Sequence, residues 1–268
     1  MARAARVPLG TLPLLALGMS LARRGVLAVV SIAICASTAL CLAVVAGVLA
    51  SRGPGSPAHD VPLVASSALA WGGGFLLAFA AAAHALRRDR AEGIRGLFVA
   101  RTTSLRGYLL ARVGGLAALI ALCVSGGTLL SGLVGAAFAA RFGLAAKTLH
   151  ATGAAVVFSI AFSAVVAPVA FAALGARSRA SGYLFLIAIV SVPEAIVAML
   201  GSLVPETVAD VVTIPSALSA LRTALAPGSV EPWRAARALV ALAAFAVAAL
   251  VLVRRDAIRV DAPDEVET

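Results

Sequence analysis

Long apolar runs constrain this chain more than any other feature of its sequence. Six such runs are visible, at about residues 26–50, 63–86, 108–138, 151–175, 182–204 and 235–253. A helix needs about 20 apolar residues to cross the hydrocarbon core of a bilayer. Hydrophobic residues make up 62% of the 268 positions and charged residues 13%, so a water-soluble fold has too little polar surface to cover them. The sequence predicts an all-α integral membrane protein with six transmembrane helices.

The apolar runs are continuous and do not alternate with polar residues, which favours helices over the strands of a membrane barrel. The third run is longer than one upright crossing needs, because a helix rises about 1.5 Å per residue. We therefore expect its first turns, Tyr108 to Arg112, to lie outside the hydrocarbon core.

The distribution of basic residues predicts the orientation, since Lys and Arg near span ends are retained in the cytoplasm. If the N-terminus is inside, the inner segments hold 16 of the 22 basic residues, namely Arg3, Arg6, Arg23, Arg24, Arg87, Arg88, Arg90, Arg95, Arg101, Arg106, Arg112, Arg177, Arg179, Arg254, Arg255 and Arg259. Both termini are then cytoplasmic. The net charge of +10 reflects this topology and contact with anionic membrane lipids, and we expect no nucleic-acid partner.

The first 25 residues allow two interpretations. MARAAR followed by an apolar stretch that ends at Ser20-Leu21-Ala22 is similar to a signal peptide, and cleavage there would invert every later loop. The charge distribution favours a cytoplasmic amphipathic helix at the membrane surface over residues 1–25, because Leu9, Leu12, Leu15 and Met19 recur at helical spacing.

The most charged stretch of the chain, residues 87–112, lies between the second and third runs. It opens with Asp89-Arg90-Ala91-Glu92-Gly93 and closes with Tyr108-Leu109-Leu110-Ala111-Arg112. The order of residues resembles the cytoplasmic loop of ABC-2 type transporter permeases. Positions that agree are Gly93, Leu97, Ala100, Arg101, Ser104, Arg106, Tyr108, Leu109 and Leu110, with Arg112 where that family usually has Lys. Gly96 replaces a common acidic residue and Thr102 replaces the usual Pro.

The resemblance implies that residues 87–107 form a coupling helix, which docks into a cleft on a separate ATP-binding subunit. It implies that Leu97 and Phe98 enter the cleft, that Asp89 and Glu92 fix the register at its rim, and that Gly93 permits a bend before the helix. Arg101 and Arg112 belong to the same expected ATPase-coupling site.

The resemblance extends to other parts of the chain. Arg177 and Arg179, between the fourth and fifth runs, occupy the place of a second cytoplasmic contact. Residues 205–232 are interrupted by prolines and are too short to span, so we expect an outer interfacial or re-entrant segment. The transmembrane domain is then 26–254, and residues 255–268, rich in acidic groups, form a disordered cytoplasmic tail.

The chain has no Gly-rich phosphate loop that ends in Lys and Ser or Thr, so any ATP must be hydrolysed on a partner chain. We expect no enzyme activity and no cofactor on this chain. With six spans it corresponds to half a permease, and a second copy, identical or related, would complete the pore.

Within the spans, Glu194 is the clearest ionisable residue, and it follows Pro193. A helix broken at Pro193 beside a buried acid would line a substrate path. Alternatively, this region starts a re-entrant hairpin with Glu194 near the outer water layer. Two stripes of small residues, Ala70-Gly74-Ala78-Ala82 and Gly127-Ser131-Gly135, predict close helix contacts, either within the chain or between two copies.

The three histidines, His59, His84 and His150, are scattered, so no metal site is expected, and the three cysteines lie in spans as small apolar residues. The sequence favours the permease subunit of an ATP-driven exporter in a bacterial inner membrane. Two alternatives remain: a lipid-modifying membrane enzyme that uses Glu194 with His150 or His84, and a stand-alone secondary carrier. The substrate, the direction of transport and the residues that touch substrate are not specified by these patterns.

Overall fold

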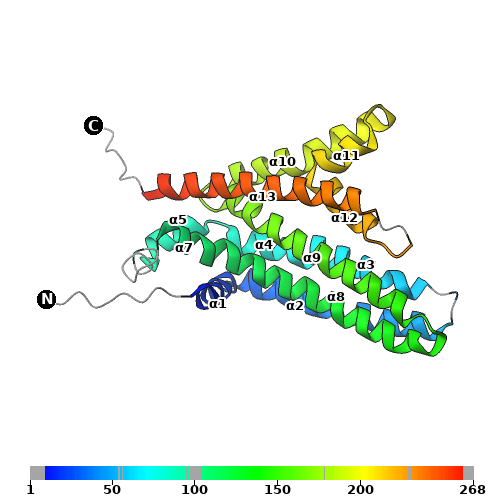
Figure 1. Cartoon of the computed structure of the whole chain (residues 1–268). Helices are drawn as coiled ribbons and strands as arrows, with labels where there is room; N and C mark the ends of the chain where they lie inside the picture. The colour runs from blue at the N-terminus through cyan, green and yellow to red at the C-terminus, as the bar shows by residue number, and fades with distance from the viewer. Residues whose placement is uncertain are drawn as a thin grey trace, which may run out of the picture.

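The computed structural model describes residues 10–53, 55, 57–94, 96, 104–177, 179–228 and 231–261. All of its regular elements are helices, and six of them are long and apolar enough to cross a membrane within that part of the chain. Their bounds are Val26–Ser51, Pro57–Ala91, Leu105–Phe142, Ala145–Leu174, Ala180–Leu200 and Pro232–Val260. The predicted class and number of spans are confirmed, and the chain is a multi-pass helical membrane protein (Figure 1).

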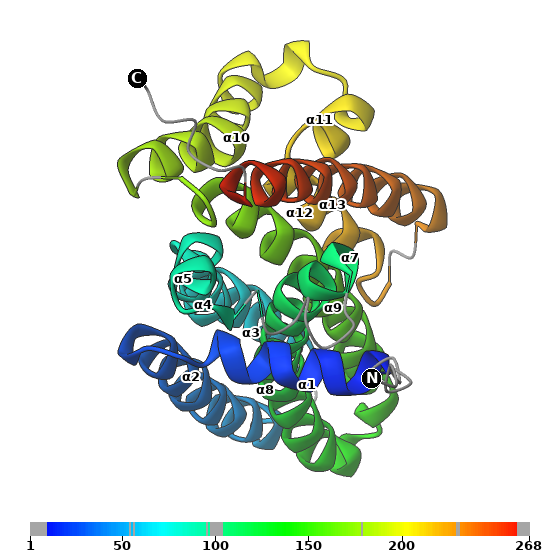
Figure 2. The same ribbon diagram turned by 90° about the vertical axis from the view of Figure 1, so that its left-hand side faces the viewer.

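A short helix, α1 (Thr11–Ala22), precedes the first span, α2 (Val26–Ser51). Figure 2 shows α1 lying crosswise to the long helices, over one end of the bundle. Leu14, Gly18 and Leu21 of α1 are buried against the bundle, whereas Leu12 is 78% exposed. The expected helix is present, but part of the apolar face predicted from the sequence points away from the other helices, where a membrane surface can receive it.

The second span is built from several pieces: a 3₁₀ turn η1 (Pro57–Asp60), α3 (Val61–Leu69), a π-helical turn η2 (Ala70–Gly74), α4 (Phe75–Ala82) and α5 (Ala85–Ala91). The third begins with α7 (Leu105–Leu109) and a second π-helical turn, η3 (Leu110–Gly114). It continues as α8 (Gly115–Ala139) and η4 (Ala140–Phe142). At 38 residues this span is about 57 Å long, so the prediction that it exceeds one crossing is confirmed.

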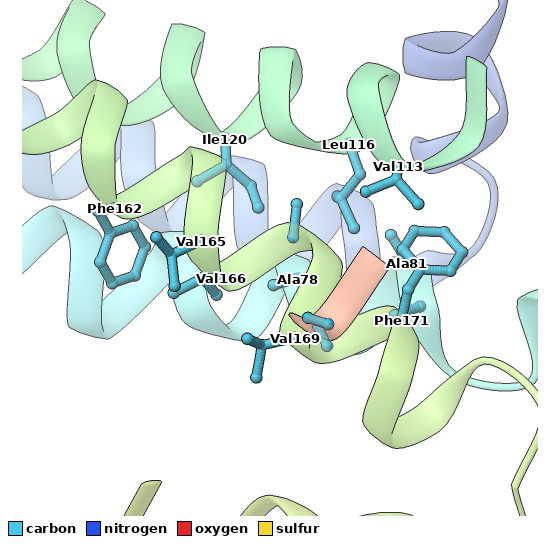
Figure 3. Packing of buried hydrophobic residues seen from close by; sticks show 14 of the residues in the cluster. Ala78, Ala81, Val113, Leu116, Ile120, Phe162, Val165, Val166, Val169 and Phe171 are labelled. Atoms are coloured by element: carbon cyan, nitrogen blue, oxygen red, sulfur yellow. The ribbon is translucent and has the colours of Figure 1, made fainter. Parts of the chain in front are cut away.

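The fourth span, α9 (Ala145–Leu174), is the central helix. In the most apolar 18-residue stretch of α9, 72% of the residues are buried. The helix packs against α8, α13, α3 and α4. Phe162, Val165, Val166, Val169 and Phe171 of α9 meet side chains of α4 and α8 in the core (Figure 3). The second, third, fifth and sixth spans therefore contact α9 directly, whereas the first span packs on the second and third.

The fifth span, α10 (Arg179–Leu200), stands apart from the core, with 6% of its apolar window buried. It is followed by η5 (Gly201–Leu203), α11 (Glu206–Val212) and α12 (Ile214–Ala224), and then by the sixth span, α13 (Pro232–Asp261). The segment before the last span is thus a pair of short helices, and α12 is buried against α13 and α9. The prediction that residues 255–268 are disordered is wrong up to Asp261, because α13 continues to that residue.

Small residues make the close helix crossings within the chain. Ala70, Gly74, Ala78 and Ala82 are all buried on the second span. A Cβ added at Gly127 of α8 would lie 2.8 Å from the Cβ of Ala39 on α2. Both predicted stripes therefore pack helices of the same chain against one another. Small residues let the backbones come close, which matters because the hydrophobic effect does not drive helices together in lipid.

Candidate functional site

The described residues of the charged stretch, 87–94, 96 and 104–112, lie at the end of the bundle where α1, α5, α7 and the last turns of α13 gather, here called the α5 end (Figures 1 and 2). The chain turns between α4 and α5 at His84, whose φ is +55°. The backbone N–H of His84 donates to Leu174 O at 3.0 Å, and that of Leu86 donates to Gly175 O at 3.1 Å. These bonds fasten α5 to the last turn of α9, so the loop starts from a fixed base.

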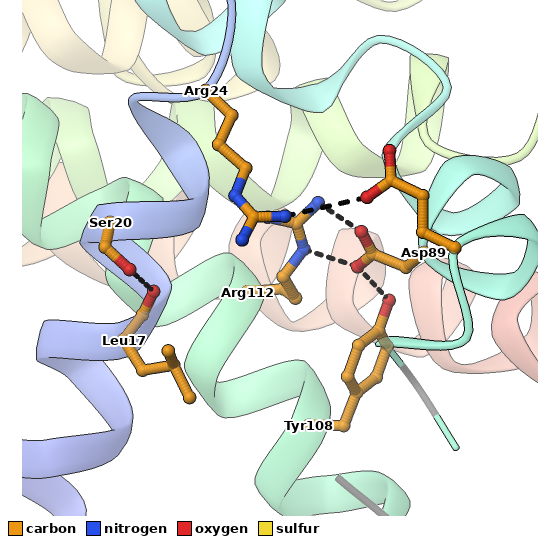
Figure 4. A network of polar contacts seen from close by, with 7 residues as sticks. Leu17, Ser20, Arg24, Asp89, Tyr108 and Arg112 are labelled. Carbon is orange, nitrogen blue, oxygen red and sulfur yellow. Dashed lines mark hydrogen bonds and ion pairs between the residues drawn. The ribbon is translucent and has the colours of Figure 1, made fainter. Parts of the chain in front are cut away.

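A buried ion pair joins α5 to the third span. Arg112 Nη2 donates to Asp89 Oδ1 at 2.9 Å, and Arg112 Nε lies 2.7 Å from Oδ2 (Figure 4). Tyr108 Oη donates to the same Oδ2 at 2.7 Å. The side chains of Asp89 and Arg112 are 1% and 2% exposed. A fork of two guanidinium nitrogens on one carboxylate fixes both distance and angle between the two segments.

The local helix geometry places these groups. Tyr108 and Arg112 are four residues apart, so they project from the same face of the third span. Arg112 lies in the π-helical turn η3, a widened turn of a kind that often occurs at functional positions. Asp89 is the only acidic residue on α5, with Arg88 and Arg90 beside it. The sequence carries one cue to this pair. An acidic residue stands at the end of one span, and a Tyr-x-x-x-Arg pattern opens the next.

The burial of this pair corrects two expectations. Asp89 and Arg112 were expected at a surface that contacts a partner subunit, and Asp89 at its rim. Both are enclosed within the chain, because each satisfies the charge of the other away from water. Their role here is to hold α5 in place.

Glu92 and Gly93 lie where α5 ends and are exposed. Gly93 has φ +68°, and its N–H donates to Arg90 O at 3.1 Å, so it turns the chain out of the helix. Glu92 Oε2 is 3.6 Å from Arg24 Nη1, an exposed pair that links the α1–α2 turn to α5. An exposed ion pair of this kind contributes about 0–1 kcal/mol to stability, so Glu92 and Arg24 can separate and pair with other groups at little cost. Leu97, Phe98 and Arg101 lie outside the described residues.

Helix α1 is anchored to the same segment by a glycine crossing. A Cβ at Gly18 would lie 1.6 Å from the carbonyl oxygen of Ala111, and a Cβ at Gly115 would lie 2.4 Å from the carbonyl carbon of Gly18. Backbones this close exclude any side chain at either position. Since Ala111 and Arg112 are neighbours, α1, α5 and η3 form one mechanical unit.

The second expected contact lies between α9 and α10. The guanidinium of Arg177 lies over the ring of Phe185, 3.9 Å from its centroid, and its Nε is 4.0 Å from Asp256 Oδ2 on α13. The backbone of Arg179 begins α10; its side chain is not described. Arg177 therefore connects three elements at the α5 end.

Pro193 and Glu194 lie in the half of α10 remote from the α5 end. The expected helix break at Pro193 is wrong: α10 is continuous from Arg179 to Leu200, with Pro193 inside it. Glu194 is half-buried, and its Oε2 accepts a hydrogen bond from Thr213 Oγ1. Thr213 is the N-cap of α12 and accepts from the N–H of Ser216 at 3.0 Å. Glu194 thus fastens the start of α12.

A second ion pair, not anticipated from the sequence, holds α11. Arg234 Nε lies 2.7 Å from Asp210 Oδ2, and Nη2 donates to Oδ1 at 2.9 Å. Together with the bond between Glu194 and Thr213, it ties the α11–α12 segment to the helices on both sides. The two partners are 24 residues apart, one on the short helix α11 and the other on the sixth span, so sequence spacing gives no cue to them.

The side chains proposed for a membrane enzyme are not gathered. His84 lies at the α5 end, whereas Glu194 lies toward the other end of the bundle and bonds Thr213. His150 is exposed near the start of α9. Among the described residues there is no group of three or more His, Cys, Asp or Glu side chains that could hold a metal ion.

Comparisons with protein-family models, with curated proteins and with solved structures found no match to this chain.

Proposed function

We propose that this chain is the membrane-spanning permease subunit of an ATP-driven exporter of the ABC-2 type. The observation that carries the proposal is the buried Asp89–Arg112 pair at the base of the loop between the second and third spans. It gives the loop a rigid connection to the spans, which a segment that receives force from a partner needs. The sequence resemblance of residues 87–112 supports the same assignment.

The connections of α5 suggest how force would travel. Its start is bonded to the end of α9, its middle is paired with Arg112 of the third span, and its end meets Arg24 beside α1. A push on residues beyond Gly93 would therefore move three spans and α1 together. A loop without such anchoring would bend and dissipate the motion.

Under this proposal the α5 end faces the cytosol, with both termini on that side of a bacterial inner membrane. A separate ATP-binding subunit would dock on residues 87–107, with Leu97 and Phe98 in its cleft and Arg177 and Arg179 as a second contact. ATP would be hydrolysed on that subunit, and this chain would hold no cofactor. A second permease copy, identical or related, would complete a path for an apolar or amphiphilic substrate.

The test is copurification from native membranes through a C-terminal tag, with mass spectrometry of the partners and an ATPase assay. We expect a stoichiometric ATP-binding subunit, lost when Leu97 and Phe98 are both changed to Glu. The matched control changes Phe142 and Leu203, exposed apolar residues at the other end, to Glu and should keep the partner. A clean preparation without an ATP-binding subunit would overturn the proposal.

A further inference from the structure

A large basic pocket opens at the α5 end between α5, the first turn of α10 and the last turns of α13. Its volume is about 1080 Å³, and its polar walls are Arg87, Arg90, Arg177, Ser181, Asp256 and Arg259. The elements that form it approach one another in Figure 2, at the end of the bundle that faces the viewer. The pocket unites side chains from three segments that are far apart in the sequence.

The charge of this pocket is strongly positive. Four arginines face a single carboxylate, Asp256, which is 14% exposed and lies 4.0 Å from Arg177. Arg90 donates to the carbonyl oxygen of Val260. Arg87 and Arg259 are exposed and make no ion pair with any described residue. Two guanidinium groups are thus available to an anion, and their planar donor geometry suits the oxygens of a phosphate.

An apolar crevice begins one helical turn below the pocket. It has a volume of about 90 Å³ between α10, α13 and α9, and Phe185, Ile189, Phe245 and Leu252 line it. Phe185 follows Ser181 by four residues, and Leu252 precedes Asp256 by four, so pocket and crevice share the same faces of α10 and α13. The Arg177 guanidinium, stacked on the ring of Phe185, marks the boundary between them.

A ligand that fits both parts has an anionic head and a hydrocarbon chain. A soluble phosphate would satisfy the arginines but gain nothing from the crevice. A protein partner approaching from the aqueous side would not reach between two membrane helices. The membrane itself supplies amphiphiles of this shape, and basic pockets between transmembrane helices suit anionic headgroups.

We propose that this site binds an anionic phospholipid from the leaflet at the α5 end. The phosphate lies between Arg87 and Arg259, and one acyl chain enters the crevice between α10 and α13. Bound there, the lipid bridges α10, which packs loosely on its own bundle, to α5 and α13. The inference does not depend on the proposed transport function, because every residue involved belongs to this chain.

The test measures lipid binding to the full-length, delipidated chain by native mass spectrometry in detergent, without any partner. Dioleoyl phosphatidylglycerol is the probe, and dioleoyl phosphatidylcholine is the neutral reference. Changing Arg87 and Arg259 together to Gln should weaken phosphatidylglycerol binding by about tenfold or more, since two charge-assisted contacts are lost. The control changes Arg52 and Arg141 to Gln, the same charge change at the other end of the bundle, and should shift affinity by less than about twofold.

Two further measurements separate the lipid from other ligands. Changing Ala248 in the crevice to Trp should weaken binding of the dioleoyl lipid but leave phosphate binding unaffected. Inorganic phosphate at millimolar concentration should not displace the lipid. If the Gln pair does not fold, the charge-preserving change of Arg87 and Arg259 to Lys should keep folding and still lower affinity. Equal weakening by the two Gln pairs, or full displacement by inorganic phosphate, would overturn the proposal.

Discussion

The carboxylate of Asp89 lies within the fork of the Arg112 guanidinium, at 2.7 and 2.9 Å, with both side chains almost fully enclosed. The two residues come from the end of one span and the start of the next. Among the described residues, Asp89 is bonded by Arg112 and by Tyr108, so this contact decides whether α5 keeps its position.

Changing Asp89 to Asn should destabilise the chain by about 3–5 kcal/mol, because the Arg112 charge would stay buried without a partner. Thermal unfolding of the detergent-purified protein measures the effect. The control changes Asp60 to Asn, since Asp60 is exposed and its ion pair among the described residues is with His59. Joint replacement of Asp89 by Leu and Arg112 by Met should recover part of the loss, as neither charge then remains buried. Equal melting temperatures for the two Asn variants would contradict the assigned role.

Changing Gly18 to Val should detach α1 from the bundle. The new side chain would collide with the carbonyl of Ala111, and overpacking of this kind costs about 1–3 kcal/mol or more. Limited proteolysis should then cut at Arg23 and Arg24 several times faster. Gly153 of α9 has open space around it, so its change to Ala serves as the control and should leave the cleavage rate unchanged. Protection of Arg23 in the Gly18 variant would refute the crossing.

The paired change of Glu92 to Arg and Gly93 to Pro should uncouple ATP use from transport while the chain still inserts. Proline cannot adopt the φ of +68° found at Gly93, and the charge reversal repels Arg24. A matched control at the other end pairs Lys147 changed to Glu with Gly143, φ +72°, changed to Pro. Transport and ATPase assays on reconstituted complexes give the measurement. Unchanged ATP-dependent transport in the variant with Glu92 and Gly93 replaced would contradict the coupling role of the loop.

Glu194 offers a test that separates charge from hydrogen bonding. Changing it to Gln keeps an acceptor for Thr213, so hydrogen exchange of α12 should stay slow, whereas Ala should accelerate it. Thr213 changed to Val removes both the donor and the N-cap, and should cost about 1–2 kcal/mol of local stability. If Gln alone alters the range of transported substrates, the charge lies on the substrate path. Wild-type transport in that variant would leave Glu194 with a fastening role only.

The orientation is open to a direct measurement. In a variant without native cysteines, a cysteine at Gly55 should react with a membrane-impermeant maleimide in intact cells, and one at Glu92 only after lysis. Both positions are exposed and lie at opposite ends of the bundle. The reverse pattern would place the N-terminus outside and remove the basis for docking a cytosolic subunit on this loop.

The spans were predictable because hydrocarbon imposes a simple rule on length and polarity, and their observed bounds follow the apolar runs closely. The sequence predicted that the small-residue stripes make close helix contacts. It did not predict whether those contacts lie within one chain or between two copies. The crossing of Gly18 with Gly115 was missed, since nothing near Gly18 in the sequence indicates which helix lies over it. The helix break at Pro193 was wrong because the rest of α10 remains helical around the proline.

The site was harder to predict than the spans. The family resemblance assigned Asp89 and Arg112 to a surface that contacts a partner subunit, whereas their burial depends on how the second and third spans pack against each other. The pairs Glu194–Thr213 and Asp210–Arg234 each join a long span to the segment of short helices between the fifth and sixth spans, and only the three-dimensional arrangement brings them together. The basic pocket likewise draws its arginines from three separate segments.

The central position of α9 also bears on how the protein is made. A ribosome delivers the chain from its N-terminus, and the first four spans contain α9 and the helices that hold Asp89 and Arg112. Their core can therefore close while the remaining segments are still being synthesised, an interval on the order of ten seconds. The last two spans then pack onto a core that has already folded. Helix α10 is inserted first, so lipid surrounds it before α13 is synthesised.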